Sequence, residues 1–322
     1  MEAERICIWD NAKVWLMIMV IIGHTVIASY GHSDIFLAYV WFFLGGYIIT
    51  MPLFFFISGF FTKRGGGVKI NKLCKNILLP FMVFNVLYKL YEPLFNEGHY
   101  SNWKVPGFAM WFLWVLFLFR LLFPLIIKIR YVFPLSLAVA LIIGFIPQIG
   151  ADYGLSRFLC FLPFYLLGYY VGHHKKLQCV KDYMLAPFSL RDGLVLGCII
   201  VAWCVILYHK PSLAFCTTFN GGYGGNWLYM LVRMSLYITA VGIGFYFLKL
   251  VPNKKVFYTK YGSRTMGVYL LHGLVVLPFA YKIFTPFEES DVLHKVLMIA
   301  IPVAISLLFF SKATDSTIKK LF

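Results

Sequence analysis

Long apolar stretches dominate this chain and limit the folds that are open to it. Crossing about 30 Å of hydrocarbon as an α-helix takes roughly 20 predominantly apolar residues. Stretches of this kind recur throughout the 322 residues, of which 61% are hydrophobic and only 13% are charged. Since a soluble domain could not bury so much apolar surface, the sequence predicts an all-α, polytopic integral membrane protein. The ten expected spans are residues 13–30, 36–61, 74–95, 107–127, 132–149, 156–172, 192–209, 227–250, 265–281 and 293–311.

The basic residues are distributed unevenly between alternate loops. A formal net charge of +16 would suit a nucleic-acid partner. If the N-terminus is cytoplasmic and the ten spans alternate, however, most of the 29 Lys and Arg residues fall on the inner side. Cytoplasmic loops of membrane proteins carry such an excess. We therefore attribute the charge to topology and expect no nucleic acid. Both termini are predicted to be cytoplasmic, in a multi-pass protein of the plasma (inner) membrane.

Nothing in the sequence divides the chain into parts. No repeat of fixed period and no long loop is visible, so we expect a single membrane domain over residues 1–322. The first apolar stretch is long enough to span, and the segment before it is as acidic as it is basic, so we expect a retained helix rather than a cleaved signal peptide. The seven cysteines show no paired spacing and predict neither a disulfide framework nor a metal site.

The first apolar helix carries a single histidine, His24, behind two charged residues. An α-helix turns about 100° per residue, so the step of 11 residues from Lys13 to His24 makes three turns plus roughly 20°. Asp10 lies about 40° to the other side, and Lys13 and His24 are about 16 Å apart along one face. Ionisable groups inside a bilayer are costly and indicate function by default. His24 therefore suits a general base, the alternative being a packing histidine bonded to a neighbouring helix.

A second histidine, His272, repeats this arrangement near the C-terminus in YGSRTMGVYLLHGLVV (261–276). Ser263, Arg264 and Thr265 stand at the predicted cytoplasmic start of that helix, and His272 lies about 11 Å further in. Two helices thus enter from one side, each with a basic residue at the mouth and a histidine at depth. This pairing favours a cleft that opens to the cytoplasm.

A basic segment follows the second predicted span. In FFFISGFFTKR (54–64), Ser58 and Gly59 precede Lys63 and Arg64, and further lysines follow at Lys69, Lys72 and Lys75. Such a cluster suits a cationic mouth for a polyanionic cytosolic ligand. The alternative is a site where small residues pack between helices, followed by an ordinary positive-inside anchor.

These segments, in this order, resemble acyltransferase family 3 of integral membrane acyltransferases, especially its fucose 4-O-acetylase-like branch. The resemblance rests on DNAKVWLMIMVIIGH, FFFISGFFTKR and TMGVYLLH, with MWFLWVLFLFRLLFP (110–124) and LSRFLCFLPFYLLGYYVG (155–172) between them. The basic position of the first motif, often arginine in the family, is Lys13 here, which keeps the charge without the planar fork. A strict Arg-x-x-Arg pair after the second span is not evident.

The resemblance implies transfer of an acetyl group from cytosolic acetyl-CoA to a hydroxyl of a surface polysaccharide, glycolipid or lipid-linked sugar. It implies three sets of site residues: for catalysis His24, Lys13, Asp10 and His272; for coenzyme binding Ser58, Lys63, Arg64, Lys72 and Arg264; for acceptor binding Trp111 and Arg157. No metal is expected. A proton-coupled secondary transporter that uses the intramembrane histidines is the alternative, although the internal repeats and broken helices typical of transporters are not visible. A noncatalytic scaffold is a third.

Overall fold

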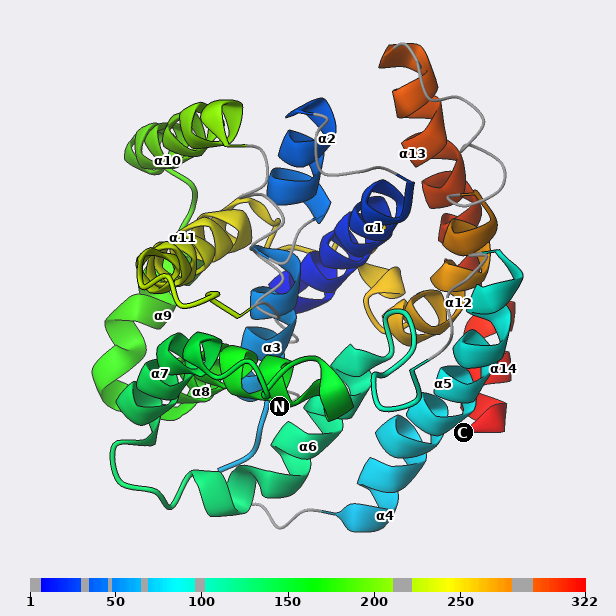
Figure 1. Ribbon diagram of the computed structural model, residues 1–322, viewed down its shortest axis with the longest axis horizontal. Coiled ribbons are helices and arrows are strands. Elements are labelled where there is room, and N and C mark those ends of the chain that lie inside the picture. Colours follow the sequence, from blue (N-terminus) through cyan, green and yellow to red (C-terminus); the bar gives the residue numbers. More distant parts are fainter. Residues whose placement is uncertain are drawn as a thin grey trace. The chain divides into compact units, whose positions relative to one another are not determined.

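A computed structural model of the chain describes residues 7–29, 35–45, 48–64, 69–95, 102–210, 222–279 and 292–322 (Figure 1). Within these ranges the protein is all-helical and has no strand, so the predicted fold class is confirmed at that level. In chain order the elements are α1 (Cys7–Ser29), α2 (Ile35–Val40), the π-helix η1 (Trp41–Gly45), α3 (Thr50–Phe60), α4 (Ile70–Leu73), the π-helix η2 (Cys74–Leu78), α5 (Leu79–Tyr91), η3 (Glu92–Leu94), α6 (Trp111–Ile126), α7 (Val132–Ile142), η4 (Ile143–Phe145), η5 (Asp152–Gly154), α8 (Leu155–His173), η6 (Lys175–Leu177), α9 (Gln178–Leu185), α10 (Leu190–His209), α11 (Leu228–Leu250), η8 (Thr259–Tyr261), α12 (Thr265–Pro278), α13 (Val292–Leu307), η10 (Leu308–Phe310) and α14 (Lys312–Leu321).

Several of these helices are long and apolar enough to cross a bilayer. Five qualify singly, and a sixth candidate is a pair bent by 65°, Lys295–Phe310 with Lys312–Leu321. The five are Cys7–Val26, Ile70–Leu94, Asp152–His173, Leu190–His209 and Leu228–Leu250. Shorter apolar helices occupy Thr50–Phe60, Trp111–Ile126, Val132–Phe145 and Thr265–Pro278. The chain is an integral membrane protein, while ten spans and cytoplasmic termini stay predictions.

The second predicted span, residues 36–61, is not one helix. It is divided into α2, η1 and α3, so the prediction of a continuous helix there is wrong. Ile48 and Ile49, the described residues between η1 and α3, form a turn. η1 ends at Gly45, and a glycine in a helix interior costs about 1 kcal/mol relative to alanine.

The helices form two compact units. The first comprises Met1–Thr50, Lys175–Thr217 and Tyr237–Ile318, and the second comprises Met51–His174, Thr218–Leu236 and Lys319–Phe322. The first part of α11 belongs to the second unit and the remainder to the first. The single domain expected over residues 1–322 stays a prediction.

In the first unit, α1 packs against α12 and α13. The start of α1 is fastened to the segment before α12 by the side chain of Asn11. Its amide nitrogen donates to the carbonyl oxygens of Pro252 at 2.7 Å and Lys254 at 3.0 Å, and its amide oxygen accepts from the Thr259 hydroxyl at 2.7 Å. These bonds satisfy a fully buried amide and fix the position of α1 relative to α12.

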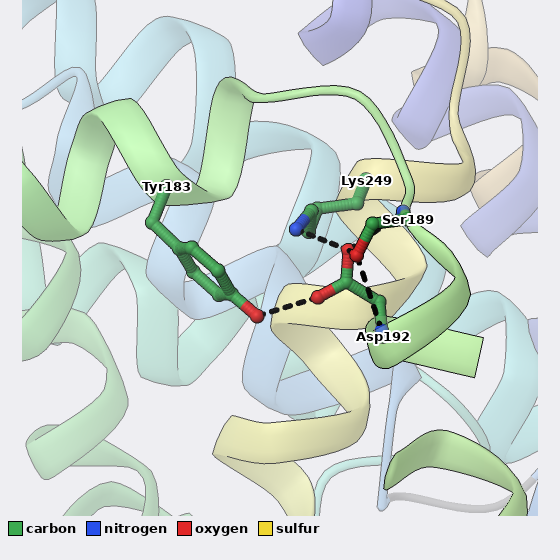
Figure 2. A network of polar contacts seen from close by, with 4 residues as sticks. All are labelled: Tyr183, Ser189, Asp192 and Lys249. Atoms are coloured by element: carbon green, nitrogen blue, oxygen red, sulfur yellow. Dashed lines mark hydrogen bonds and ion pairs between the residues drawn. The ribbon is translucent and has the colours of Figure 1, made fainter. Parts of the chain in front are cut away.

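A buried polar network joins α9, α10 and α11 in the same unit. Figure 2 shows the Asp192 carboxylate between the Tyr183 hydroxyl, which donates to it at 2.6 Å, and the Lys249 ammonium. Ser189 forms a capping box at the start of α10, because its hydroxyl oxygen accepts from the Asp192 backbone N–H at 3.3 Å and its own backbone N–H donates to the Asp192 carboxylate at 2.8 Å. The hydrogen bond to Asp192 raises the pKa of Tyr183 to about 12. The network ties three helices through one carboxylate.

In the second unit, α3 and α8 approach so closely that only glycine fits between them. A Cβ atom on Gly59 would overlap the carbonyl oxygen of Tyr165, and one on Gly168 would overlap that of Phe56. The packing alternative for the Ser58–Gly59 segment is therefore correct for Gly59. The phenyl ring of Phe55 is fully buried among aromatic neighbours, including Phe119 and Phe161. Next to this core α7 packs along α8, as Figure 1 shows.

Candidate functional site

His24 and His272 lie side by side in the interior of the first unit. The Nδ1 atom of His24 is 3.1 Å from Nε2 of His272, and their ring centroids are 5.1 Å apart. His24 is 8% exposed and His272 is fully buried. The two predicted intramembrane histidines, 248 positions apart in sequence, are thus brought into one hydrogen-bonded pair by the packing of α1 on α12.

The hydrogen bonds of the pair determine which ring nitrogens carry protons. Nδ1 of His272 lies 2.7 Å from the carbonyl oxygen of Tyr269, and since a carbonyl only accepts, Nδ1 holds the proton. Nε2 of neutral His272 is then an acceptor, so Nδ1 of His24 donates to it. In neutral His24 the lone pair therefore lies on Nε2. If that atom took up a proton, His272 would stabilise the resulting imidazolium, as the third group of a catalytic triad does.

Asp10 and Lys13, the charged residues predicted to share the face of His24, form an ion pair at the start of α1. The Lys13 ammonium is 2.7 Å from Asp10, and the carboxylate side chain is 7% exposed. Because Lys13 precedes His24 by about 16 Å along the helix axis, the two side chains cannot meet the same reacting atom. The catalytic roles of Lys13 and Asp10 stay predictions, and what the structure records for them is a mutual ion pair.

Arg264 stands just before α12 and binds the end of a neighbouring helix. One of its guanidinium nitrogens donates to the carbonyl oxygen of Phe310 at 3.1 Å, at the end of η10. Basic side chains commonly satisfy the last carbonyls of a helix in this way. The recorded contact is structural, and the predicted role of Arg264 in coenzyme binding stays a prediction.

A basic pocket lies in the second unit, between the end of α3, the α4–η2 segment and α6. Its volume is about 370 Å³, and among the described residues that line it there are four cations and no acid. The cations are Lys63, Lys69, Lys72 and Arg120. Two of them, Lys63 and Lys72, are predicted coenzyme-binding residues, while Ser58 and Arg64 do not line the pocket. The glycines at 65–67 lie outside the described residues.

The sequence did not assign Arg120 to this pocket. The sequence shows Arg120 as a charged residue in an apolar helix. Which residues face the pocket, however, depends on the π-helix η2. That π-helix comes just before Pro80, which has no N–H to donate one turn back, so the regular hydrogen-bond pattern is interrupted there. Asn76 and Ile77 of η2 contribute to the pocket wall opposite Arg120 and Phe123 of α6.

Trp111 and Arg157, the two residues predicted to bind the acceptor, lie together. The guanidinium carbon of Arg157 is 4.4 Å from the Trp111 ring centroid. Trp111 is only 2% exposed and stacks on Phe161 with centroids 5.5 Å apart. Its ring is therefore part of the packed interior, and the predicted role of Trp111 in acceptor binding stays a prediction. Arg157 is half-buried, and its predicted role in acceptor binding stays a prediction.

Comparison with known proteins decides the class of the chain. A family model described as an acyltransferase domain matches residues 8–311. The chain belongs to acyltransferase family 3. The match to this acyltransferase family includes both histidines and every residue of the basic pocket. No curated protein and no solved structure matches the chain.

Membership of the family makes the chain a membrane acyltransferase, so the predicted family and reaction class are confirmed. The fucose 4-O-acetylase-like branch stays a prediction. The family match gives no support to the transporter alternative. Among the described residues no group of three His, Cys, Asp or Glu side chains could hold a metal ion.

Proposed function

We propose that this acyltransferase moves an acetyl group from cytosolic acetyl-CoA to a hydroxyl of a carbohydrate, with His24 as the general base. The carbohydrate would be a surface polysaccharide, a glycolipid or a lipid-linked sugar. The observation that carries the proposal is the His24–His272 pair, because its hydrogen bonds place the lone pair of neutral His24 on Nε2. An imidazole nitrogen with a lone pair can remove the proton of a hydroxyl near neutral pH.

The proposed reaction balances without a metal or an oxidant. Nε2 of His24 takes the proton of the acceptor hydroxyl as the oxygen attacks the thioester carbonyl of acetyl-CoA. The carbon–sulfur bond then breaks, and the departing thiolate takes the proton from the His24 imidazolium. The products are an acetyl ester and coenzyme A. His272 accepts a hydrogen bond from the Nδ1–H group of His24 throughout. This bond orients the base and stabilises its charged form.

The basic pocket supports coenzyme A as the donor. Coenzyme A carries a pyrophosphate and a 3′-phosphate, which require cations. The pocket supplies three lysines as mobile point charges and one arginine, whose planar guanidinium can bind two phosphate oxygens at once. In this proposal Lys63, Lys69, Lys72 and Arg120 bind the phosphates. A neutral acyl donor would not require four cations in its binding pocket.

The experiment uses purified protein in liposomes with radiolabelled acetyl-CoA and a panel of carbohydrate acceptors. We expect transfer of label to at least one of them. Lys72→Gln should raise the KM for acetyl-CoA by about 5-fold, the equivalent of 1 kcal/mol, and leave kcat unchanged. Lys75→Gln is the matched control, because Lys75 is exposed on η2 and does not line the pocket.

Two results would contradict the proposal. The first is equal KM values for the Lys72 and Lys75 variants, which would remove the pocket from donor binding. The second is the absence of any acetyl change in surface glycans of cells that lack the protein, measured by mass spectrometry. That comparison reports the acyl group and the acceptor together.

A further inference from the structure

An apolar groove in the second unit shares no lining residue with the basic pocket. Its volume is about 320 Å³, and α6, α7 and α8 all contribute to its walls. Its lining consists of Leu122, Leu125, Ile126, Ile129, Val132, Leu135, Ser136, Val139, Phe158, Leu159 and Leu162. The single hydroxyl, of Ser136, already donates to the carbonyl oxygen of Phe133 at 2.7 Å. The walls therefore suit a purely apolar occupant.

The rim of the groove is exposed among the parts of the chain that the structure describes. Leu125 on α6 is 64% exposed, and Leu135 on α7 is 50% exposed. In an integral membrane protein, apolar side chains exposed along such helices face lipid. A hydrocarbon chain of a lipid can therefore enter the groove from the membrane.

Two cations lie on the turn that joins α6 to α7, on either side of a residue that lines the groove. Lys128 and Arg130 are both exposed, and they flank Ile129, whose side chain lines the groove. Arg130 is held by its neighbour, because its guanidinium donates to the Tyr131 hydroxyl at 3.0 Å and lies 4.8 Å from the centroid of that ring. Tyr131 adopts a left-handed backbone conformation with φ of 57° at the start of α7. The two positive charges therefore adjoin the apolar groove.

A hydrocarbon groove adjoined by two cations matches the chemistry of one kind of molecule. A free phosphate would satisfy the cations and leave the groove empty. A neutral lipid would fill the groove and leave the cations without a partner. An anionic phospholipid fits both parts, and basic residues at the cytoplasmic ends of membrane helices attract such headgroups. The turn is also on the cytoplasmic side in the predicted topology, where anionic lipids concentrate.

We infer that this groove is a binding site for an anionic phospholipid, with one acyl chain between α6, α7 and α8 and the phosphate on Lys128 and Arg130. The inference does not depend on the proposed acetyl transfer. It assigns a role to the two cations that the donor pocket does not use, and it makes the bound lipid part of the packing of the second unit.

Native mass spectrometry of the purified full chain tests this, with phosphatidylglycerol titrated against phosphatidylcholine. One phosphatidylglycerol should bind with about 25-fold preference, since each cation contributes about 5-fold. The double variant Lys128→Gln/Arg130→Gln should lose that preference. The matched control is Lys175→Gln/Lys176→Gln, which removes two exposed charges on η6. It should keep the preference.

A second variant tests the groove itself. Val139→Trp places a larger side chain in the groove wall and should weaken retention of both lipids, with the melting temperature reporting whether the fold survives. Equal affinity for the two lipids in the wild type would overturn the inference. So would loss of the preference in the Lys175/Lys176 control, or unchanged lipid retention by folded Val139→Trp protein.

Discussion

In the proposed reaction, His272 acts through the orientation of His24. Its proton is directed to the Tyr269 carbonyl, and its Nε2 accepts from His24. At the scale of single residues, these two bonds fit both the proposed base and the alternative of a packing histidine bonded to a neighbouring helix. Variants of His272 separate the two.

The first prediction separates this positioning role from simple packing. His272→Leu should lower kcat by about 100-fold, because His24 then loses its acceptor and its charged form loses support. His272→Gln should recover part of the rate, because an amide oxygen can accept from His24 Nδ1. The measurement is kcat and KM for acetyl-CoA for the three proteins. Equal rates for the Leu and Gln variants would show that the hydrogen bond is not what matters.

The residues of the site were only partly predictable from the sequence. His24 and His272 stood out because ionisable groups are rare inside apolar helices. Their pairing was not predictable, because helical spacing determines the face of a residue but not which helix packs against that face. The burial of Trp111 was not predictable either, because the sequence indicates an aromatic side chain but not whether its ring is buried.

At the scale of elements, the contact between α3 and α8 depends on glycine. Gly59→Ala or Gly168→Ala should destabilise the protein by about 2 kcal/mol, because the new methyl group would overlap a backbone carbonyl that cannot move independently. The control is Gly197→Ala in α10, where nothing lies within 4 Å of a Cβ. Alanine should be neutral or stabilising there. Melting in detergent measures all three, and similar melting temperatures for the three variants would contradict this packing.

The second element-scale prediction concerns the Asp192 network of α9, α10 and α11. Asp192→Asn or Lys249→Met should each lower the melting temperature by several degrees, because each leaves a buried partner unsatisfied. The melting temperature of the double variant should be higher than the sum of the two single losses predicts, because neither side chain of the buried pair is then charged. Strictly additive losses would mean that the two side chains act independently.

The element bounds were predicted more accurately than the element shapes. Apolar stretches identify where helices lie to within a few residues, as α8 and α10 show. They do not reveal a break such as that between η1 and α3, or a π-helix such as η2, because local glycine and proline effects change the hydrogen-bond pattern without changing hydropathy. The basic pocket depends on η2, which is why Arg120 was not assigned to it.

At the scale of the whole molecule, the membrane topology is the prediction with the widest consequences. In a cysteine-free background, single cysteines at Lys104 and Lys176 occupy exposed positions in predicted outer and inner loops. A membrane-impermeant maleimide should label Lys104→Cys in intact cells. Lys176→Cys should react only after permeabilisation. Labelling of both in intact cells, or the reverse pattern, would contradict ten spans with cytoplasmic termini.

The central claim is that His24 is the base for acyl transfer, and single-turnover transfer of labelled acetyl from acetyl-CoA tests it most directly. His24→Gln should transfer acetyl about 10²- to 10⁴-fold more slowly than wild type, while its melting temperature and affinity for acetyl-CoA stay unchanged. His173→Gln is the matched control, since His173 bonds the carbonyl of Tyr169 on its own helix, as His272 bonds that of Tyr269, but lies outside the pair. Wild-type rates for folded His24→Gln protein would contradict the mechanism.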